Sequence, residues 1–549
     1  MIFRFYLPLF TAAIGLQIMQ TAVSGAFAGT PEKNADFIVG KTGVKNGLAL
    51  DIGCGDGTLA AAIAERTGLK IYCLESEQSA VAGVRSRLCA AGLYGLRVSA
   101  GEADLTSLVY PDNFANLVFF GDGLKEGFRE RKASEILRVT NPNGFALIGG
   151  NDARADDLAH WLDNGGVEDY RIIRESGAWA LIKKPFDARW DEWRQRNHDS
   201  ANTFASRDTS LNGLEYRLQW TVRPPAGLGS SFALLAGGRQ FVVCSDAQGA
   251  PPGLTPSIHA YDAFNGVLIW KREGRSEKSF NRSVSLYSPQ RPCSDAIATE
   301  KHLYLLGGRT CRLFNASTGE TEYSWRIPAA AGPGKDHVWL YISSFKNLIY
   351  GASGRMRKRL PRAGEMSGYE SERGIAHALF AMDARSGGVR WIKRKPVIAA
   401  SITVGGNRIF YADPELRHHA LDARTGRELW AETQPGYLGR FLNRIGQNKG
   451  PARPKIKIVQ NTFVIGKLWV LFQLGGYTGW GSPKLAAVLS GEDGSFLFQP
   501  ELRFARGPLG GKDRAIGWLT FADKKVFASP IHGMGVSAWL DANTGDRME

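Results

Sequence analysis

The stretch from Leu48 to Gly57 constrains the fold of this chain more than any other segment. Apolar residues lead into Asp51, and an apolar run at helical spacing, 59–63, follows the stretch. Glycines stand between them at three alternate positions, Gly53, Gly55 and Gly57. Glycine lets a backbone approach a ligand closely and adopt turn angles that side chains forbid, and a helix start offers unpaired N–H groups. The pattern predicts a strand, a tight turn and a helix that together hold a cofactor at the edge of an α/β sheet.

The spacing Asp-x-Gly-x-Gly-x-Gly differs from the Gly-x-Gly-x-x-Gly of a dinucleotide site. It resembles the first motif of class I S-adenosylmethionine-dependent methyltransferases. The resemblance implies a Rossmann-like α/β domain over residues 31–184 that binds S-adenosylmethionine, with the glycines making room for its methionine half and ribose. A purely structural glycine turn is the alternative.

Later segments follow in the order of that family. A strand over 70–75 ends in Glu75, 24 residues after Asp51. A carboxylate at this place can accept hydrogen bonds from both ribose hydroxyls, which is the role the resemblance implies for Glu75. An exposed acid at a strand end is the alternative.

A helix over 79–91 and a strand over 96–99 lead to the next expected contacts. The resemblance places Glu102 and Ala103 beside the adenine, with Asp104 as the fallback for Glu102. We expect Thr30–Lys45 to be polar and to cap the sheet.

The fourth strand, expected over 117–121, is followed by Asp122. In this family the end of that strand faces the reacting atoms, so Asp122 is a weak candidate for a catalytic base, and a simple turn residue is the favoured alternative. The Asn/Asp-Pro-Pro-Tyr motif of many amino-group methyltransferases is absent, and Asn116 stands where the family often has an acid. The remaining predicted elements are a helix over 128–139, a strand over 145–148, a helix over 156–162, and strands over 169–174 and 178–183.

The first residues predict export. Arg4 precedes an apolar stretch, 7–19, and Ala26-Phe27-Ala28 has the small-residue pattern of a cleavage site. We therefore expect residues 1–28 to be a signal peptide cleaved after Ala28, and the mature chain to be periplasmic or in the cell envelope. An uncleaved membrane anchor is the alternative, and no later stretch is long and apolar enough to span a bilayer.

Residues 185–217 are expected to form a charged and aromatic connector. It contains His198 beside Asp199, a pair that invites a catalytic interpretation. Structural docking of the connector is the favoured interpretation. The segment resembles the joint of bacterial proteins that fuse a methyltransferase-like domain to a quinoprotein-like propeller.

An internal repeat fills residues 218–549. Its clearest copies begin at Tyr261, Met382 and Leu421, and each combines Asp-Ala and a glycine with a Trp four residues after that glycine. Asp and Gly suit a tight hairpin turn, and the Trp ring can cover the gap between neighbouring sheets. The pattern resembles the pyrroloquinoline-quinone-type (PQQ-type) repeat and implies an all-β propeller. Six copies are visible, seven or eight blades remain possible, and we expect 218–220 to close the ring by joining the last blade.

The cysteine count and the net charge say little about which partners the chain binds. The six cysteines are too few for a disulfide scaffold, and Cys54 and Cys73 resemble small core residues rather than bridge partners. No spacing indicates a metal site, and no residue cluster supports a bound quinone, so PQQ is not predicted. The net charge of +15 permits an anionic partner, yet a solvated basic surface is favoured and nucleic acid is not indicated.

These features favour an exported, monomeric S-adenosylmethionine-dependent methyltransferase whose propeller recognises a substrate or partner. The expected partner is a methyl acceptor, whose identity the sequence does not give, or an envelope polymer. The alternative is a non-catalytic envelope binding or scaffold protein that carries a relict cofactor fold, because S-adenosylmethionine is expected to be scarce outside the cytoplasm. A quinone-dependent dehydrogenase ranks well below both.

Overall fold

The protein is described here from a computed structural model. The described residues run from 30 to 548, apart from these segments: 122–129, 151–152, 176, 204–205, 211–217, 223–230, 245–256, 274–295, 356–374, 416, 433–455, 465–468, 477–484, 499–515, 523–524, 531–537 and 542–546. The chain divides into two compact units, Met1–Lys184 and Pro185–Glu549. The predicted signal peptide and Asp122 lie outside the described residues.

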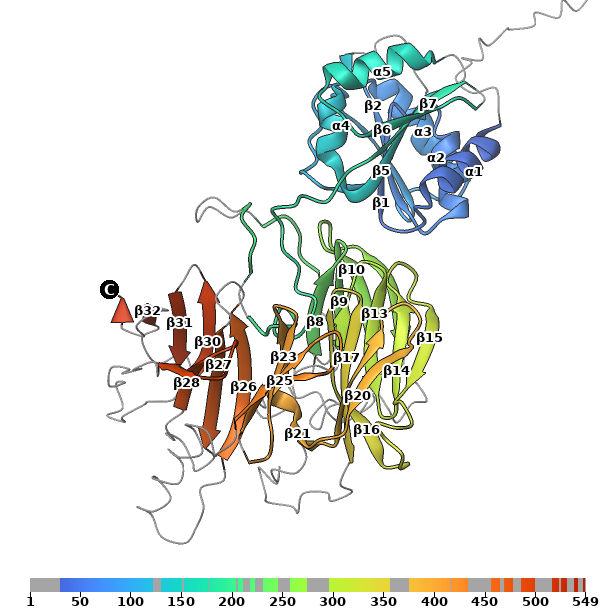
Figure 1. Ribbon diagram of the computed structural model, residues 1–549. Coiled ribbons are helices and arrows are strands. Elements are labelled where there is room, and N and C mark those ends of the chain that lie inside the picture. Colours follow the sequence, from blue (N-terminus) through green and yellow to red (C-terminus); the bar gives the residue numbers. More distant parts are fainter. Residues whose placement is uncertain are drawn as a thin grey trace, which may run out of the picture. The chain divides into compact units, whose positions relative to one another are not determined.

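The first unit is built on one seven-stranded sheet in the order β3-β2-β1-β4-β5-β7-β6 (Figure 1). Strands β1 to β5 pair in parallel, and β7 runs antiparallel to both β5 and β6. The strands are β1 (Leu48–Ile52), β2 (Lys70–Glu75), β3 (Val98–Glu102), β4 (Ala115–Phe119), β5 (Thr140–Gly150), β6 (Tyr170–Ile173) and β7 (Ala178–Lys183). This confirms the predicted Rossmann-like α/β fold.

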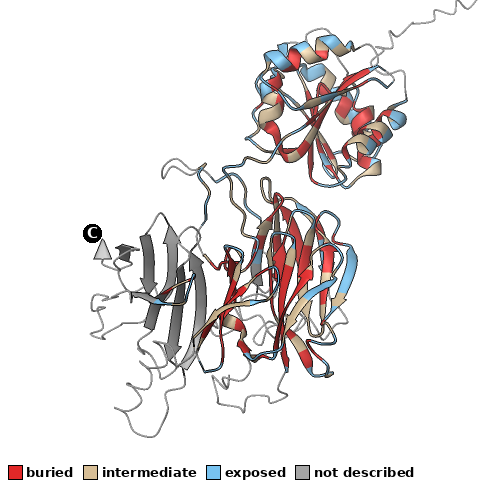
Figure 2. Ribbon diagram, in the orientation of Figure 1, coloured by how far each residue is buried: buried red, intermediate tan, exposed pale blue. Residues whose placement is uncertain are grey.

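Helices cover both faces of this sheet, because successive strand residues point to opposite sides. In β1, Ala49 packs with helices α1 to α3, whereas Leu50 and Ile52 pack with α4 and α5. Figure 2 shows the buried strands between these two helical layers. The helices are α1 (Pro31–Thr42), α2 (Thr58–Arg66), α3 (Gln78–Ala90), α4 (Ala133–Val139) and α5 (Ala155–Asn164). Among the described residues, none of the helices has the length and apolar character needed to span a membrane.

The segment Thr30–Lys45 differs from the expectation, because most of it is helix α1. Thr30 caps the helix, Pro31 stands in its first turn, and Gly43 ends it in a left-handed conformation with φ of 68°. The predicted strand over 96–99 also lies too early, since β3 begins at Val98. The short apolar run was not enough to locate the strand start, because residues 93–97 form backbone turns between the end of α3 and β3.

The described residues of the second unit form six four-stranded antiparallel sheets, as the six repeats predicted. Within each, strands follow in chain order from one edge to the other. The sheets are β8 (Ser231–Ala236), β9 (Arg239–Cys244), β10 (Ser257–Asp262) and β11 (Leu268–Glu273); β12 (Ala296–Ala298), β13 (His302–Gly307), β14 (Thr310–Asn315) and β15 (Thr321–Arg326); β16 (His337–Phe345), β17 (Leu348–Arg355), β19 (Ala378–Asp383) and β20 (Val389–Lys393); β22 (Thr403–Gly405), β23 (Arg408–Ala412), β24 (His418–Asp422) and β25 (Glu428–Ala431); β26 (Ile456–Val464), β27 (Trp469–Gly476), β28 (Leu485–Ser490) and β29 (Phe496–Phe498); β30 (Ile516–Ala522), β31 (Lys525–Pro530), β32 (Ala538–Asp541) and β33 (Arg547–Met548). A two-stranded pair, β18 (Ile375–Ala376) and β21 (Val397–Ile398), contacts the third and fourth of these sheets.

The repeat motif works as a joint between neighbouring sheets. In the fourth sheet, the Asp422 carboxylate accepts backbone hydrogen bonds from the two central turn residues, and Gly426 adopts φ of 71°. Trp391 of the third sheet lies over Gly426, and its indole N–H donates to the Ala423 carbonyl over 3.1 Å. The same Trp–Gly contact joins the other described neighbours: Trp270 to Gly319, Trp325 to Gly387 and Trp430 to Gly494. The predicted role of the repeat tryptophan is confirmed.

Segment 218–220 does not join the last sheet, contrary to the expectation. The last sheet has its own fourth strand, β33, and residues 218–222 form no strand. Instead, Trp220 lies over Gly266 in the turn of the first sheet, and the Gln219 side chain donates to the Phe264 carbonyl over 3.0 Å. Trp220 thus supplies to the first sheet the contact that the second to fifth sheets each receive from the sheet before them.

The predicted connector belongs to the second unit (Figure 1). The first strands of neighbouring sheets contact one another, from β8 through β12 and β16 to β22, so these strands form the inner edges of the array. The connector backbone pairs with three of these edges. Leu235 donates to Trp193 over 2.8 Å, Ala298 to Arg194 over 2.8 Å, and Val404 to Ser200 over 2.8 Å.

Candidate functional site

The strand order of the first unit reverses between β1 and β4, the place where open α/β sheets bind ligands at the carboxyl ends of their strands. Asp51 lies there near the end of β1 and is fully buried. Its carboxylate accepts a 2.6 Å hydrogen bond from the backbone N–H of Gly121, just after β4. A β-carbon on Gly121 would lie 2.7 Å from both carboxylate oxygens, so only glycine fits. Asp51 therefore holds two strand ends together.

The glycine loop follows directly. Gly53, Gly55 and Gly57 all have left-handed backbones, with φ of 76°, 61° and 78°. The N–H of Gly53 donates to the Leu74 carbonyl over 2.8 Å, which fixes the loop to β2. Gly57 caps α2, and a β-carbon on it would lie 2.9 Å from Val84 of α3. The loop thus has the conformation that the glycine spacing predicted.

Glu75 and Glu102 end two neighbouring strands at the same edge. They are paired in the register of β2 and β3, and Glu102 is exposed. One oxygen of Glu75 accepts the N–H of Gly55 over 2.6 Å, so the loop and the acid touch. Ala103 follows Glu102, and its N–H donates to the Glu75 carbonyl over 2.8 Å. The structure thus brings Glu75, Glu102 and Ala103 to one edge beside the glycine loop.

The fallback residue and the departure from the family pattern have local explanations. Asp104 accepts hydrogen bonds from the hydroxyl and the N–H of Thr106, and these lower the pKa of its carboxyl. Asn116 lies near the start of β4, where its side chain accepts the Leu48 N–H over 2.9 Å. That is the amino-terminal end of the strands, away from the candidate site.

Two residues of this edge were not identified from the sequence. Gly121 could have been, because a glycine directly after a buried strand signals a close approach. Arg131 had no such signal. It is buried, donates to the Ile52 carbonyl over 3.0 Å, and lies over the ring of Phe120 at 4.7 Å. Arg131 therefore links the end of β1 to Phe120, the residue that directly follows β4.

Comparisons with known proteins agree with both units. Residues 49–144 match the family model of a methyltransferase domain, and residues 373–464 match that of outer membrane protein assembly factor BamB, a PQQ-repeat family. The chain combines a methyltransferase domain with PQQ-type propeller repeats. No curated protein matches the chain.

Several solved structures are similar to one unit or the other. A candidate S-adenosyl-L-methionine-dependent methyltransferase from Methanococcus maripaludis is 21% identical over 29% of this chain and 85% of its own, with a TM-score of 0.26. A methyltransferase from Aquifex aeolicus is 19% identical over 27% of this chain and 89% of its own, with a TM-score of 0.23. BamB from Moraxella catarrhalis is 13% identical over 57% of this chain and 82% of its own, with a TM-score of 0.30.

The connector contains a buried polar cluster at the inner edge of the propeller. His198 is 1% exposed and has φ of 82°. Its ring nitrogens lie 2.7 Å from Asp191 and 2.6 Å from the Thr203 hydroxyl. Ser200, the nearest serine along the chain, donates its hydroxyl to the Val404 carbonyl instead. These contacts support the docking interpretation of the connector over a catalytic one.

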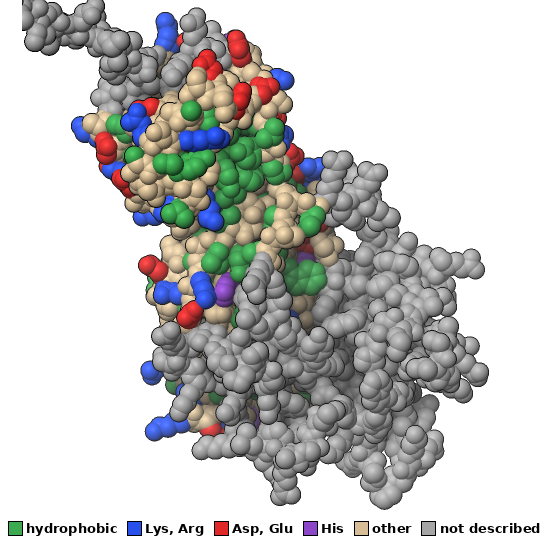
Figure 3. Space-filling model, turned by 180° about the vertical axis from the view of Figure 1, so that it is seen from behind, with side chains coloured by type: hydrophobic (Ala, Val, Ile, Leu, Met, Phe, Trp, Pro, Cys, Tyr) green, Lys and Arg blue, Asp and Glu red, His purple; other side chains and the backbone are tan. Residues whose placement is uncertain are grey.

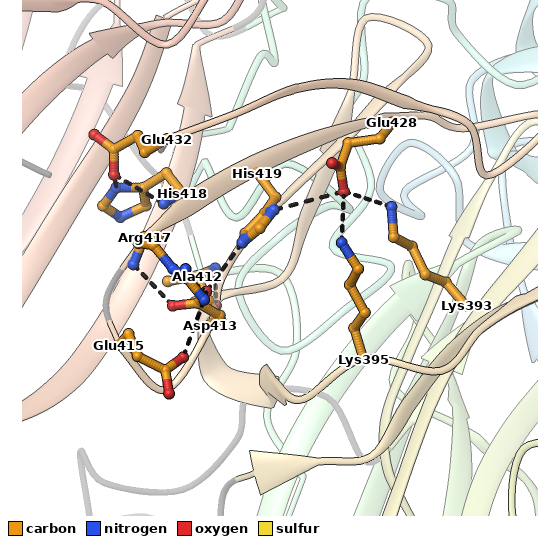
Figure 4. A network of polar contacts seen from close by, with 11 residues as sticks. Lys393, Lys395, Ala412, Asp413, Glu415, Arg417, His418, His419, Glu428 and Glu432 are labelled. Atoms are coloured by element: carbon orange, nitrogen blue, oxygen red, sulfur yellow. Dashed lines mark hydrogen bonds and ion pairs between the residues drawn. The ribbon is translucent and has the colours of Figure 1, made fainter. Parts of the chain in front are cut away.

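The fourth sheet carries a network of ion pairs, shown in Figure 4. His419 lies between Asp413 at 3.2 Å and Glu428 at 3.7 Å. Glu428 also pairs with Lys393 of the third sheet at 2.6 Å, and Asp413 with Arg417 at 2.7 Å. Burial alone would raise the pKa of Asp413, but the hydrogen bonds from His419 and Arg417 hold it below the ordinary value. The network ties neighbouring sheets together.

Charged residues of the methyltransferase domain are mixed in sign. On the face shown in Figure 3, Lys and Arg side chains alternate with Asp and Glu around hydrophobic ones. Among the described residues, no group of three or more His, Cys, Asp or Glu is arranged to hold a metal ion. The glycine-loop edge therefore remains the candidate site of this domain.

Proposed function

We propose that the methyltransferase domain binds S-adenosylmethionine at the glycine-loop edge and transfers its methyl group to an acceptor recognised with the help of the propeller. The observation that carries the proposal is the contact of Gly55 with Glu75 at the switch point of the sheet. It places a side-chain-free backbone beside a strand-end carboxylate, as a bound ribose requires.

The residues present fit the cofactor. The three left-handed glycines of the loop carry no β-carbons, so a ligand can approach the backbone at these positions. Glu75 would accept hydrogen bonds from the ribose hydroxyls, and Glu102 with Ala103 would border the adenine. Asp51 would act through Gly121 and the loop, as a positioning residue. The cofactor supplies an electrophilic methyl group on a sulfonium.

Little else is required of the protein for this reaction. Methyl transfer is an in-line displacement, and holding two reactants in line can supply much of the catalysis. A dedicated base is therefore unnecessary for acceptors that are already nucleophilic. Asp122 remains the candidate where a proton must be removed.

The Glu75 assignment is tested by equilibrium binding of S-adenosylmethionine to the full chain. Glu75→Ala should weaken binding at least tenfold, because a hydrogen bond to a charged group contributes about 1.5–3 kcal/mol. The matched control is Glu65→Gln on the exposed face of α2, which should leave affinity unchanged. Equal affinities for both variants would remove Glu75 from the site.

The second candidate is a non-catalytic envelope binding protein. It is favoured by the predicted signal peptide, which would carry the chain away from the cytoplasmic cofactor pool. We propose export with cleavage after Ala28 and a monomeric mature chain. Amino-terminal sequencing of the envelope fraction and a sedimentation measurement test these points. Binding of an anionic polymer by residues 185–549, with no effect of S-adenosylmethionine in the full chain, would favour this candidate.

We propose no PQQ for the propeller and no dehydrogenase activity for the protein. The edges of β8, β12 and β22 are hydrogen-bonded to the connector of the same chain, which supports a structural use of these edges.

A further inference from the structure

Two cysteines lie together beneath the glycine loop. Cys54 stands inside the loop, and Cys73 lies in β2, two residues before Glu75. Their exposed fractions are 2% and 1%, and both belong to the core between the sheet and helices α1 to α3. The sequence alone suggested two separate core residues.

The two side chains touch. The Cys54 thiol donates a hydrogen bond to the Cys73 sulfur. The backbones are also joined next to them, because the N–H of Cys54 donates to the Leu74 carbonyl over 3.2 Å, and Asp51 is paired with Cys73 in the register of β1 and β2. Cys54 lies three residues beyond the register partner of Cys73, and its backbone bonds to the residue next to Cys73. A disulfide, which joins α-carbons roughly 4.4–6.8 Å apart, would replace the hydrogen bond between the two thiols.

We propose that Cys54 and Cys73 form a disulfide that ties the glycine loop to β2. The oxidant is a disulfide compound such as oxidised glutathione. The thiolate of one cysteine attacks a glutathione sulfur and releases one reduced glutathione. The second cysteine then attacks the mixed disulfide and releases the other, so the two thiols are oxidised and one glutathione disulfide is reduced to two thiols.

The environment sets when the bond forms. The hydrogen bond with Cys73 and burial both raise the pKa of the Cys54 thiol. The hydrogen bond that Cys73 receives lowers the pKa of its thiol, but burial together with the nearby Asp51 and Glu75 carboxylates raises that pKa above the ordinary value. Exchange requires a thiolate, so it is slow in the closed structure at neutral pH and proceeds during folding or local opening.

The bond would brace the candidate cofactor edge. Gly55 follows Cys54 directly, and Gly55 donates to Glu75, so the new covalent link runs beside that hydrogen bond. This consequence rests on the proposed function, whereas the disulfide itself does not. A failure of either is therefore visible separately.

The experiment is peptide mass spectrometry of the full chain. The protein is unfolded and then refolded with oxidised glutathione at about pH 8.5, close to the free thiol pKa, so that both thiols can react. It is then unfolded, alkylated and cut with trypsin. Cys54 and Cys73 fall in different tryptic peptides, 46–66 and 71–85, and the exposed Cys89 falls in a third, 88–97. We expect a linked pair of the first two peptides that is lighter by two hydrogens than their sum.

Cys89 is the internal control because it should take up glutathione and so report that the oxidant works. Cys54→Ser and Cys73→Ser should each leave the remaining thiol alkylated or carrying glutathione. The oxidised wild type should melt about 5–10 °C higher than the reduced protein in the transition of the first unit. Full alkylation of both Cys54 and Cys73 while Cys89 is modified would overturn the proposal, as would a link from either of them to Cys89.

Discussion

The glycine-loop edge of the methyltransferase domain and the inner edge of the propeller differ in what occupies them. At the first, the three glycines of the loop carry no side chains beside Asp51 and Glu75. At the second, the connector fills the edges of three sheets with its own backbone and with buried polar side chains such as His198. We propose a ligand for the first edge, whereas the second is occupied by the chain.

This difference indicates where function resides. An edge strand exposes unpaired N–H and C=O groups that another chain or a ligand can use. The connector uses these groups at β8, β12 and β22, so the partner recognition that we propose for the propeller would involve other surfaces. The methyltransferase domain is left with the candidate small-molecule site.

The largest expected effect comes from separating the propeller from the connector. Fragment 185–549 should unfold cooperatively, whereas fragment 218–549 should be aggregated or lack a cooperative transition. Fragment 218–549 loses three backbone hydrogen bonds and several side-chain hydrogen bonds at the inner edges of the sheets. Each buried group left unpaired costs about 1–3 kcal/mol, whereas the total stability of a protein is about 5–15 kcal/mol. Thermal unfolding followed by circular dichroism measures this, and equal transitions for both fragments would make the connector dispensable.

A methyl group at the switch point should have the next largest effect. Gly121→Ala places a β-carbon against the buried Asp51 carboxylate, so we expect a loss of about 2–3 kcal/mol and at least tenfold weaker cofactor binding. Gly101→Ala is the control, since a β-carbon there meets nothing within 4 Å. Urea unfolding and binding of S-adenosylmethionine are measured together. Similar behaviour of the two variants would contradict the packing of Asp51 against Gly121.

The joint between sheets predicts a smaller effect. Gly426→Ala forces a β-carbon to 2.6 Å from the Trp391 ring and should cost about 2 kcal/mol. Gly308→Ala is the matched control, because Gly308 also has a left-handed backbone, with φ of 58°, but no atom within 4 Å of a β-carbon. It should cost only about 1 kcal/mol for the backbone strain. The midpoints of denaturant unfolding of the full chain measure both costs. Equal costs for the two variants would mean that the Trp–Gly contact adds nothing to stability.

The ion-pair network predicts the smallest effect, which depends on pH. Hydrogen bonds from His419 and Arg417 lower the pKa of Asp413, so this carboxylate stabilises the folded state fully above its ordinary pKa of 3.8. The contribution is lost as the pH falls from about 4 through the lowered value. Asp413→Asn should lower stability at pH 7 and flatten the loss of stability below pH 4. A parallel pH profile for variant and wild type would show that the network contributes nothing.

Sequence reasoning located the methyltransferase domain well because its signals are local. The glycine spacing, the strand ending at Glu75 and the repeat Asp-x-x-x-Gly turns each report their own conformation. Helix α1 was missed although Thr30, Pro31 and Gly43 carry its start and stop signals, since its polar composition masked them. Arg131, the Cys54–Cys73 contact and the pairing of the connector with β22 could not be predicted, because each depends on residues brought together only by the fold.

The most direct measurement is calorimetric titration of the full chain with S-adenosylmethionine, beside the variant Gly55→Arg. The account predicts micromolar binding to the wild type and none to the variant, because an arginine at this left-handed position fills the approach to the loop backbone and disturbs its contact with Glu75. No heat from a well-folded wild type, or equal binding by both proteins, would contradict the assignment of the glycine-loop edge as the cofactor site.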